Sequence, residues 1–197
     1  MQRSRLFVPT FLGSALLAGC ASLSGAPAQP SMEEMQQRQI EYMTPGAGHQ
    51  VLNDRVGQWK MEVRYWLPGV PDPMVSLGTS SMQWIMDGRY IEDQTQASTD
   101  QGPFEGRGFV GFDNLTKEYV STWIDSMSTA VMISRGTFDA ATNTFNFTGE
   151  MPDPATGGVL PLRSVETKLD SNHWRVEMFV TGPEGEFKQM ELNYSRM

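Results

Sequence analysis

Ten short segments with turn residues at both ends follow one another from residue 59 to the end of the chain. They cover approximately residues 59–66, 78–86, 89–97, 104–112, 118–125, 131–138, 144–151, 160–169, 173–180 and 187–196. In the first, apolar Trp59, Met61 and Val63 alternate with charged residues, which is typical of a strand with one buried and one wet face. No helical period of useful length interrupts the series, so the sequence predicts an all-β domain.

The connections between these segments favour an up-and-down barrel. In a meander, successive connections alternate between the two ends of the sheet. The second, fourth, sixth and eighth connections therefore share one end, and all four are tight turns that contain Asp: 87–88, 113–117, 139–143 and 170–172. The other five are longer and gather at the opposite end. We expect an antiparallel barrel of about ten strands, pinched at one end and open at a mouth rimmed by loops.

Two local motifs support the meander. Asp87-Gly88 lies between two strand-like runs and predicts a two-residue type I′ hairpin turn. Residues 112–119 and 138–145 share the pattern Phe-Asp-x-x-Thr-x-x-aromatic. In each copy we expect the Asp to cap a tight turn and the residue after the Thr to adopt a left-handed conformation.

The first twenty residues differ from the rest and predict an export signal. Arg3 and Arg5 precede an apolar run, residues 6–17, that is too short to cross a bilayer. The run ends in Leu-Ala-Gly-Cys, and Cys20 is the only cysteine in the chain. This ending resembles the bacterial lipoprotein signal, in which the cysteine becomes an acylated N-terminus. The alternative is an ordinary signal peptide with a chance cysteine.

The resemblance to lipoproteins also implies an address. Because Ala21 is not acidic, it implies sorting to the outer membrane of a Gram-negative bacterium, with the protein on the periplasmic side. Several acyl chains, at about 0.8 kcal/mol per buried methylene, make a firm anchor. Removal of the signal changes the formal charge from −8 to −10, because Arg3 and Arg5 leave with it. That charge disfavours nucleic acid and anionic membrane surfaces as partners, so membrane contact is expected through the lipid alone.

The chain divides into three predicted parts. Residues 1–19 are the signal, residues 20–46 hold the lipidated Cys20, a flexible tether and a short helix, and residues 47–197 form the barrel domain. Ser31 is the expected N-cap of the helix, residues 32–43. A shorter helical turn, about residues 48–56, is expected to plug one end of the barrel. The sequence gives no indication of oligomeric state.

Several motifs resemble known families. Gly57-x-Trp59, the short helix before it and Arg196 in the last strand resemble the calycin superfamily of lipocalin-like barrels. Four stretches, at 41–46, 56–59, 119–125 and 149–154, resemble the bacterial domain-of-unknown-function family 1579 over about residues 32–197. This resemblance implies a calycin-type barrel, and the family carries no established activity or site.

The last strand also predicts a specific contact at the pinched end. Its register places Arg196 on the inward face beside Trp59, where a cation–π contact is worth about 0.5–2 kcal/mol. The alternative is a frayed, solvated arginine. Gly57, Trp59 and Arg196 are therefore predicted structural residues of the barrel base.

No cofactor or metal is predicted. His49 lies in the expected plug without a second ligand at useful spacing, and is interpreted as a solvent or capping histidine. The haem-binding nitrobindin type, a relative in fold, uses a histidine from the barrel. Here His173, the only histidine after the plug, lies beside a turn. Residues 106–111 fit Gly-x-Gly-x-x-Gly, but a strand follows instead of the helix that a dinucleotide site needs.

The inward registers define a candidate binding site. They place aromatic and Met side chains in the lumen, together with two charged ones, and the predicted ligand-binding residues are Trp84, Tyr119, Trp123, Asp125, Arg135 and Met178. The first hypothesis is that the barrel binds a small, largely apolar molecule. One alternative is an isomerase or hydrolase that uses Asp125 and Arg135; another is a structural envelope protein with a filled barrel. No Ser–His–Asp or Cys–His arrangement is available, so no catalytic residue is predicted.

Overall fold

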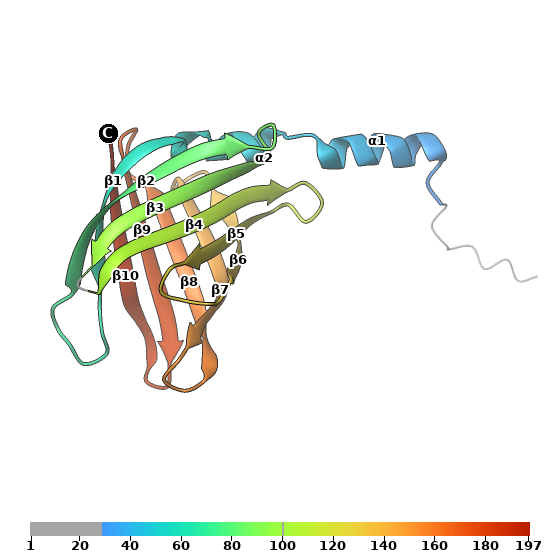
Figure 1. The fold of residues 1–197 in the computed structure, drawn as a ribbon. Helices are drawn as coiled ribbons and strands as arrows, with labels where there is room; N and C mark the ends of the chain where they lie inside the picture. The colour runs from blue at the N-terminus through green and yellow to red at the C-terminus, as the bar shows by residue number, and fades with distance from the viewer. Residues whose placement is uncertain (1–28, 100) are drawn as a thin grey trace, which may run out of the picture.

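The computed structural model describes residues 29–99 and 101–197, and ten of its strands form one closed antiparallel barrel (Figure 1). The strands are β1 Gly57–Tyr65, β2 Met74–Ile85, β3 Tyr90–Thr99, β4 Gly102–Asp113, β5 Glu118–Asp125, β6 Met132–Asp139, β7 Thr144–Asp153, β8 Gly158–Lys168, β9 His173–Gly182 and β10 Gly185–Arg196. Each strand pairs with the next in sequence, and β1 pairs with β10 from Trp59–Arg196 to Tyr65–Met190. The predicted all-β up-and-down barrel is confirmed, with strand ends that shift by up to four residues. The predicted signal and Cys20 lie outside the described residues.

Three helical segments precede the barrel: α1 Met32–Met43, α2 Ala47–Gln50 and the 3-10 helix η1 Val51–Arg55. We call α2 and η1 together the plug, because they cover one end of the barrel (Figure 1). Leu52 of the plug is fully buried and belongs to the hydrophobic core. The predicted helix and the predicted plug are both present.

The helix α1 projects away from the barrel and has no buried residue (Figure 1). Ser31 and Glu34 form a reciprocal cap at its start, where Ser31 Oγ accepts the Glu34 N–H at 3.2 Å. At its end, Asn114 Nδ2 donates to the carbonyls of Glu41 at 3.0 Å and Thr44 at 2.8 Å. The barrel thus binds one end of α1. In the described part of the chain, no helix has the length and apolarity needed to cross a membrane.

The Asp-containing turns lie at the plug end, as the meander predicts. Asp113 and Asp139 each accept the backbone N–H two residues further on, at 2.8 Å. Lys117 (φ 61°) and Asn143 (φ 51°), which follow the Thr of each motif, are left-handed. Both parts of the turn prediction are therefore confirmed.

The hairpin at Asp87-Gly88 is longer than predicted. Asp87 (φ 55°) and Gly88 (φ 80°) have the positive φ that a type I′ turn needs, but Met86 is also left-handed (φ 48°). Strand pairing accordingly ends at Ile85–Tyr90, which leaves four residues in the connection instead of two.

The contrast in loop length between the two ends is smaller than predicted. At the mouth, Thr99 pairs with Gly102, and Gly182 pairs with Gly185, so two of the mouth connections are also tight. The strands extend further there because backbone hydrogen bonds continue past the alternating side chains that mark a strand in the sequence. Asp153 builds a further Asp turn at the mouth, where it accepts the Ala155 N–H at 3.1 Å.

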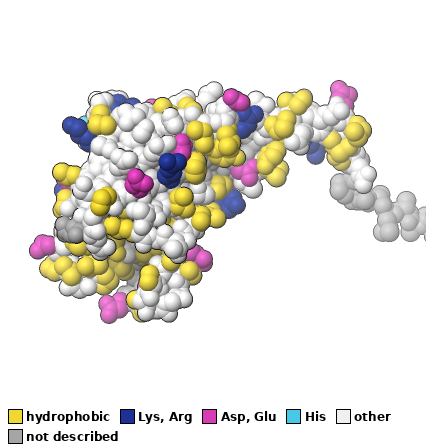
Figure 2. Space-filling model, viewed as in Figure 1, with side chains coloured by type: hydrophobic (Ala, Val, Ile, Leu, Met, Phe, Trp, Pro, Cys, Tyr) yellow, Lys and Arg dark blue, Asp and Glu magenta, His cyan; other side chains and the backbone are white. Residues whose placement is uncertain are grey.

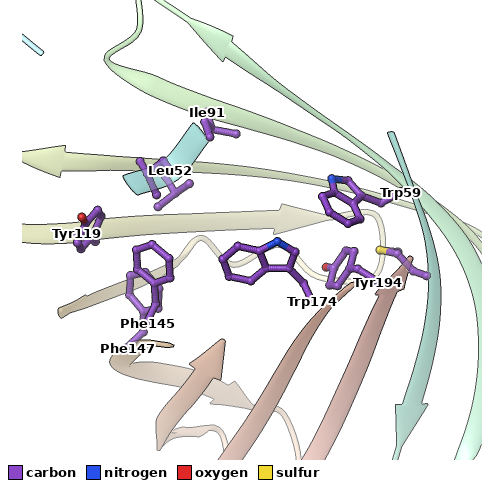
Figure 3. Close-up of a cluster of buried hydrophobic side chains, with 10 residues drawn as sticks. Leu52, Trp59, Ile91, Tyr119, Phe145, Phe147, Trp174 and Tyr194 are labelled. Carbon is purple, nitrogen blue, oxygen red and sulfur yellow. The ribbon is translucent and has the colours of Figure 1, made fainter. Parts of the chain in front are cut away.

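Aromatic side chains pack at the plug end of the barrel interior (Figure 3). Phe145 and Phe147 are almost completely buried, and the ring of Phe145 meets that of Tyr119 edge to face at 4.9 Å. Trp59 is also buried and packs at a right angle against Tyr194. This cluster seals one end of the barrel and leaves the remainder of the lumen to be lined by other side chains.

Arg196 holds the last strand to the plug. Its Cζ lies 4.2 Å from the Trp59 ring, which confirms the predicted cation–π contact. Its Nη1 donates to the Val56 carbonyl at 2.8 Å and its Nη2 to the Asp54 carbonyl at 3.0 Å. Gly57 has φ +142°, and a Cβ atom at this position would overlap Arg196 Nη1. Glycine is therefore required beside the arginine for two reasons, its backbone angle and its lack of a side chain.

This contact predicts the stability of a glycine variant. Gly57→Ala should lower the free energy of unfolding by about 1–3 kcal/mol, because it adds backbone strain and displaces Arg196. Gly69→Ala is the matched control: Gly69 also has positive φ (+78°), but nothing lies within 4 Å of its added Cβ. Urea unfolding of both variants measures the difference, and equal losses would show that the overlap with Arg196 costs nothing.

Candidate ligand-binding site

A cavity of about 1570 Å³ runs through the barrel from the plug end to the mouth loops. Ligand pockets in proteins typically measure about 300–1,000 Å³, so this space is ample for a small molecule. Its wall is mostly apolar and includes Met61, Val63, Met132, Leu162, Val176 and Met178. The hypothesis of a barrel filled by its own side chains is therefore wrong.

Hydrophobic side chains also gather at the rim of the mouth. Figure 2 shows them along the lower edge of the barrel, where the mouth loops lie. Leu67, Val70 and Met74, from the connection between β1 and β2 and the start of β2, are each more than two-fifths exposed. The rim of the mouth is therefore apolar, like most of the cavity wall.

Three of the predicted site residues line the cavity: Trp123, Asp125 and Met178. The indole Nε1 of Trp123 donates to Asp125 Oδ2 at 3.0 Å, and its ring stacks near Phe104. Asp125 Oδ1 accepts the Met127 N–H at 2.9 Å. Asp125 therefore caps a mouth turn and orients Trp123.

Trp84 and Tyr119 face inward but do not border the cavity, because the plug occupies their end of the barrel. Trp84 Nε1 donates to Asn53 Oδ1 at 2.9 Å, and the Tyr119 hydroxyl donates to the Gly48 carbonyl at 2.9 Å. The prediction that these two side chains contact a ligand is wrong for this geometry. They hold the plug in place.

The predicted inward position of Arg135 is wrong. Its side chain is 55% exposed, and its Nη1 lies 3.9 Å from Glu118 Oε2 on the outer surface. On β6, the exposed Ile133 faces outward with Arg135, while Ser134 lines the cavity. The apolar register misled the prediction because this strand carries its aliphatic side chains on the solvent face. Asp125 and Arg135 consequently lie on opposite sides of the wall, and the proposed catalytic pair does not form.

A charged pair that the sequence prediction missed lies at the plug end of the cavity. Arg55, the last residue of η1, extends into the barrel and pairs through Nη2 with Glu166 of β8. The two side chains are only 12% and 13% exposed. The Arg55 guanidinium lies 4.5 Å from the Phe145 ring and 5.2 Å from the Trp174 ring. Both members of the pair line the cavity.

A buried carboxyl group lies near this pair. Oδ1 of Asp93, on β3, accepts from Ser80 Oγ at 2.6 Å and from Thr95 Oγ1 at 3.0 Å. Burial raises the pKa of Asp93, although these hydrogen bonds and the charge of Arg55 act in the opposite direction. Burial also raises the pKa of the Tyr194 hydroxyl well above its ordinary value. We call Arg55, Asp93, Glu166 and Tyr194 the polar floor, because all four line the cavity.

Two nitrogen atoms, one in the polar floor and one in the neighbouring Trp174, lack hydrogen-bond partners. Among the side chains of the described residues, Arg55 Nε and Trp174 Nε1 are the buried polar atoms without a partner. An unsatisfied buried donor costs about 1–3 kcal/mol, and buried polar groups in native proteins are usually bonded. Both nitrogens are covered by protein atoms, so the folded chain itself leaves these donors unsatisfied.

Sequence periodicity gave only a weak signal for the polar floor. Asp93 and Glu166 lie on segments 89–97 and 160–169, whose alternation does not select an inward face. Inward polar residues remove the very pattern that identifies an inward face. Arg55 lies in the plug, where strand periodicity does not apply; its place just before Val56-Gly57 was the only available signal.

The histidine of the plug has a structural role. His49 Nδ1 accepts the Gly46 N–H at 3.1 Å, and burial lowers the pKa of its ring. The capping interpretation is therefore confirmed. The part of the chain that the structure describes contains no group of three or more His, Cys, Asp or Glu residues placed to hold a metal ion.

Fold and cavity together define a class: a closed up-and-down β-barrel with an internal cavity that opens at one end. Residues 44–196 match the family described as "Protein of unknown function (DUF1579)", and the chain belongs to this family. No curated protein matches the chain.

Several solved β-barrels are similar to the chain at low sequence identity. A de novo designed fluorescence-activating β-barrel is 15% identical, with a TM-score of 0.40, and the match covers 72% of this chain and 93% of that one. A redesigned β-barrel is 13% identical, with a TM-score of 0.37, covering 76% of this chain and 95% of that one. A protein solved bound to DFHBI is 10% identical, with a TM-score of 0.40, covering 77% of this chain and 100% of that one.

The raised pKa of Asp93 predicts how stability changes with pH. The unfolded chain loses this proton near pH 4, but the folded protein keeps it to higher pH, so Asp93 lowers the free energy of unfolding as pH rises above about 4. Asp93→Asn does not ionise. Its stability relative to the native protein should therefore increase between about pH 4 and pH 7.

Asp113→Asn is the control with the opposite sign. The backbone hydrogen bond from Leu115 lowers the pKa of Asp113, so its carboxylate stabilises the fold above the unfolded pKa and loses this effect as pH falls. The stability of this variant relative to the native protein should decrease as pH rises. Urea unfolding at several pH values and constant ionic strength measures both trends. A flat difference for Asp93→Asn would contradict a raised pKa.

Proposed function

We propose that this protein is a binding protein that holds a small, largely apolar molecule in its barrel. The observation that carries the proposal is the cavity of about 1570 Å³ with a mostly apolar wall and an open mouth. Transfer of apolar surface from water releases about 25 cal/mol per Å², so enclosing about 300 Å² of a ligand would contribute about 7 kcal/mol before the costs of binding. That gross term is sufficient for binding of useful strength.

The flexible side chains of the wall favour binding of a range of related ligands over binding of one ligand of fixed shape. Met61, Met132 and Met178 line the cavity from three different strands. Methionine is unbranched and polarisable, so such a wall adapts to ligands of different outline. Trp123 and Met178 are the predicted ligand contacts that retain this role, with Asp125 as a polar group near the mouth.

A lumen-blocking variant tests the proposal. Ala97 lines the cavity, while its neighbour Gln96 is exposed on the outer face of β3. Ala97→Trp should weaken binding of the fluorescent dye propionyl-dimethylaminonaphthalene by about tenfold or more, because the indole occupies the space of the dye. Gln96→Trp, with the same substitution on the other face, should bind as the native protein does. Fluorescence titration measures both, and equal binding by all three proteins would place the dye outside the barrel.

We further propose that a lipid at Cys20 anchors the barrel to the periplasmic side of the outer membrane. The support is the Leu-Ala-Gly-Cys motif after a short apolar run, with Ala21 rather than an acidic residue following it. The anchor would hold a water-exposed barrel close to a source of apolar molecules.

The anchor predicts a labelling result. Cells that express the full chain and receive radioactive palmitate should incorporate label into the protein, and the Cys20→Ala variant should lose both the label and the membrane fraction. A native protein without label, or a labelled Cys20→Ala variant, would contradict acylation at this position.

A further inference from the structure

We propose that the polar floor binds an uncharged carbonyl oxygen of the enclosed molecule, so that the ligand enters carbonyl first. This inference rests on the proposed function and specifies the class of ligand: an apolar body with a ketone, ester or amide oxygen at one end. The carbonyl would lie at the plug end, and the apolar body would extend along the methionine-rich wall toward the mouth.

The first support is the position of the charges. Arg55 is the one cationic side chain among the described residues that line the cavity, and it lies at the closed end. It reaches the lumen from the plug, while Glu166 and Asp93 reach it from β8 and β3. Elements far apart in sequence thus place polar groups together at the closed end of the cavity.

The second support is the number of free donors. A guanidinium has five N–H groups, and the hydrogen bond that Arg55 makes within the described residues uses only Nη2, toward Glu166. Nη1 therefore has no hydrogen-bond partner among the described residues, whereas Nε and the Nε1 of Trp174, which also lack partners, are covered by protein atoms and do not face the lumen. Asp93 adds a donor when its carboxyl group is protonated. A ligand acceptor at the polar floor would accept from Nη1 of Arg55.

The third support concerns charge. The charges of Arg55 and Glu166 cancel, and burial favours the neutral form of Asp93. A ligand carboxylate would add an unpaired negative charge next to Glu166 in a space of low polarity, which is costly. A ligand ammonium group would be repelled by the positive charge of Arg55, and neither group could accept a hydrogen bond from the other. An uncharged acceptor avoids both costs, and a carbonyl oxygen accepts from two donors at once.

Two dyes that differ in one group test the inference. Propionyl-dimethylaminonaphthalene carries a carbonyl, and its emission moves to longer wavelength when that carbonyl accepts hydrogen bonds. Dimethylaminonaphthalene lacks the propionyl group. The native protein should bind the carbonyl dye about 10- to 100-fold more tightly, the range expected for a hydrogen bond to a charged group. The infrared carbonyl band of the bound dye should shift to the lower frequency of a hydrogen-bonded carbonyl.

The variant removes the ion pair as a unit, because removing one partner leaves a buried charge. Arg55→Met with Glu166→Gln should reduce the affinity for the carbonyl dye by about 10- to 100-fold and leave that for the second dye within about twofold. The control makes the same substitutions in an ion pair of the outer wall, Arg163→Met with Glu186→Gln, where Arg163 Nη2 lies 2.7 Å from Glu186 Oε2. It should change neither affinity.

The outcomes separate the two proposals. If the native protein binds neither dye, both the proposed function and this inference fail. Only this inference fails if the native protein binds both dyes equally. It also fails alone if Arg55→Met with Glu166→Gln (the floor variant) weakens binding of both dyes to the same extent, because the barrel then binds apolar molecules without recognising the carbonyl. If the floor variant does not fold, the infrared band of the dye in the native protein decides, and an unshifted carbonyl band overturns the inference.

Discussion

The pairing of β1 with β10 is the constraint on which the rest of the structure depends. It joins the first and last strands from Trp59–Arg196 to Tyr65–Met190 and converts a meander into a closed cylinder. Closure satisfies the backbone groups of both edge strands within the barrel. Closure also encloses a lumen that is too wide for the inward side chains of the ten strands to fill. The cavity is therefore a consequence of strand number and closure, before any individual lining residue is considered.

The plug turns this cylinder into a cup. The plug and the residue that follows it accept hydrogen bonds from Trp84, Tyr119 and Arg196, and Leu52 of the plug is fully buried in the hydrophobic core. The same short segment ends in Arg55, which carries a positive charge into the lumen. The element that closes the barrel thus also supplies its most polar group, so the stability of this end and the character of the cavity are linked.

The polar floor lowers the stability of the folded state relative to an apolar packing of the same space. A buried ion pair often contributes little net stability, and the unsatisfied donors of Arg55 and Trp174 contribute a loss. Aliphatic side chains would pack at this position at lower cost, as they do along the wall nearer the mouth. This cost to stability supports the proposal that the polar floor recognises a ligand. By contrast, the ion pair of Arg163 and Glu186, which has the same chemistry, lies on the outer surface and is partly exposed to solvent.

Local periodicity and turn chemistry in the sequence were sufficient to predict the strand series, the Asp turns at 113–117 and 139–143, the plug and the contact between Arg196 and Trp59. They did not predict the length of the hairpin at Asp87-Gly88. The same periodicity placed Trp123, Asp125 and Met178 on the lumen. The tertiary structure was needed to show which inward residues line the cavity and which contact the plug, as Trp84 and Tyr119 do. It also decided that Arg135 faces solvent and that Arg55, Asp93 and Glu166 meet. Residues far apart in the chain come together only through barrel closure, and inward polar side chains erase the alternation by which a sequence reveals its inner face.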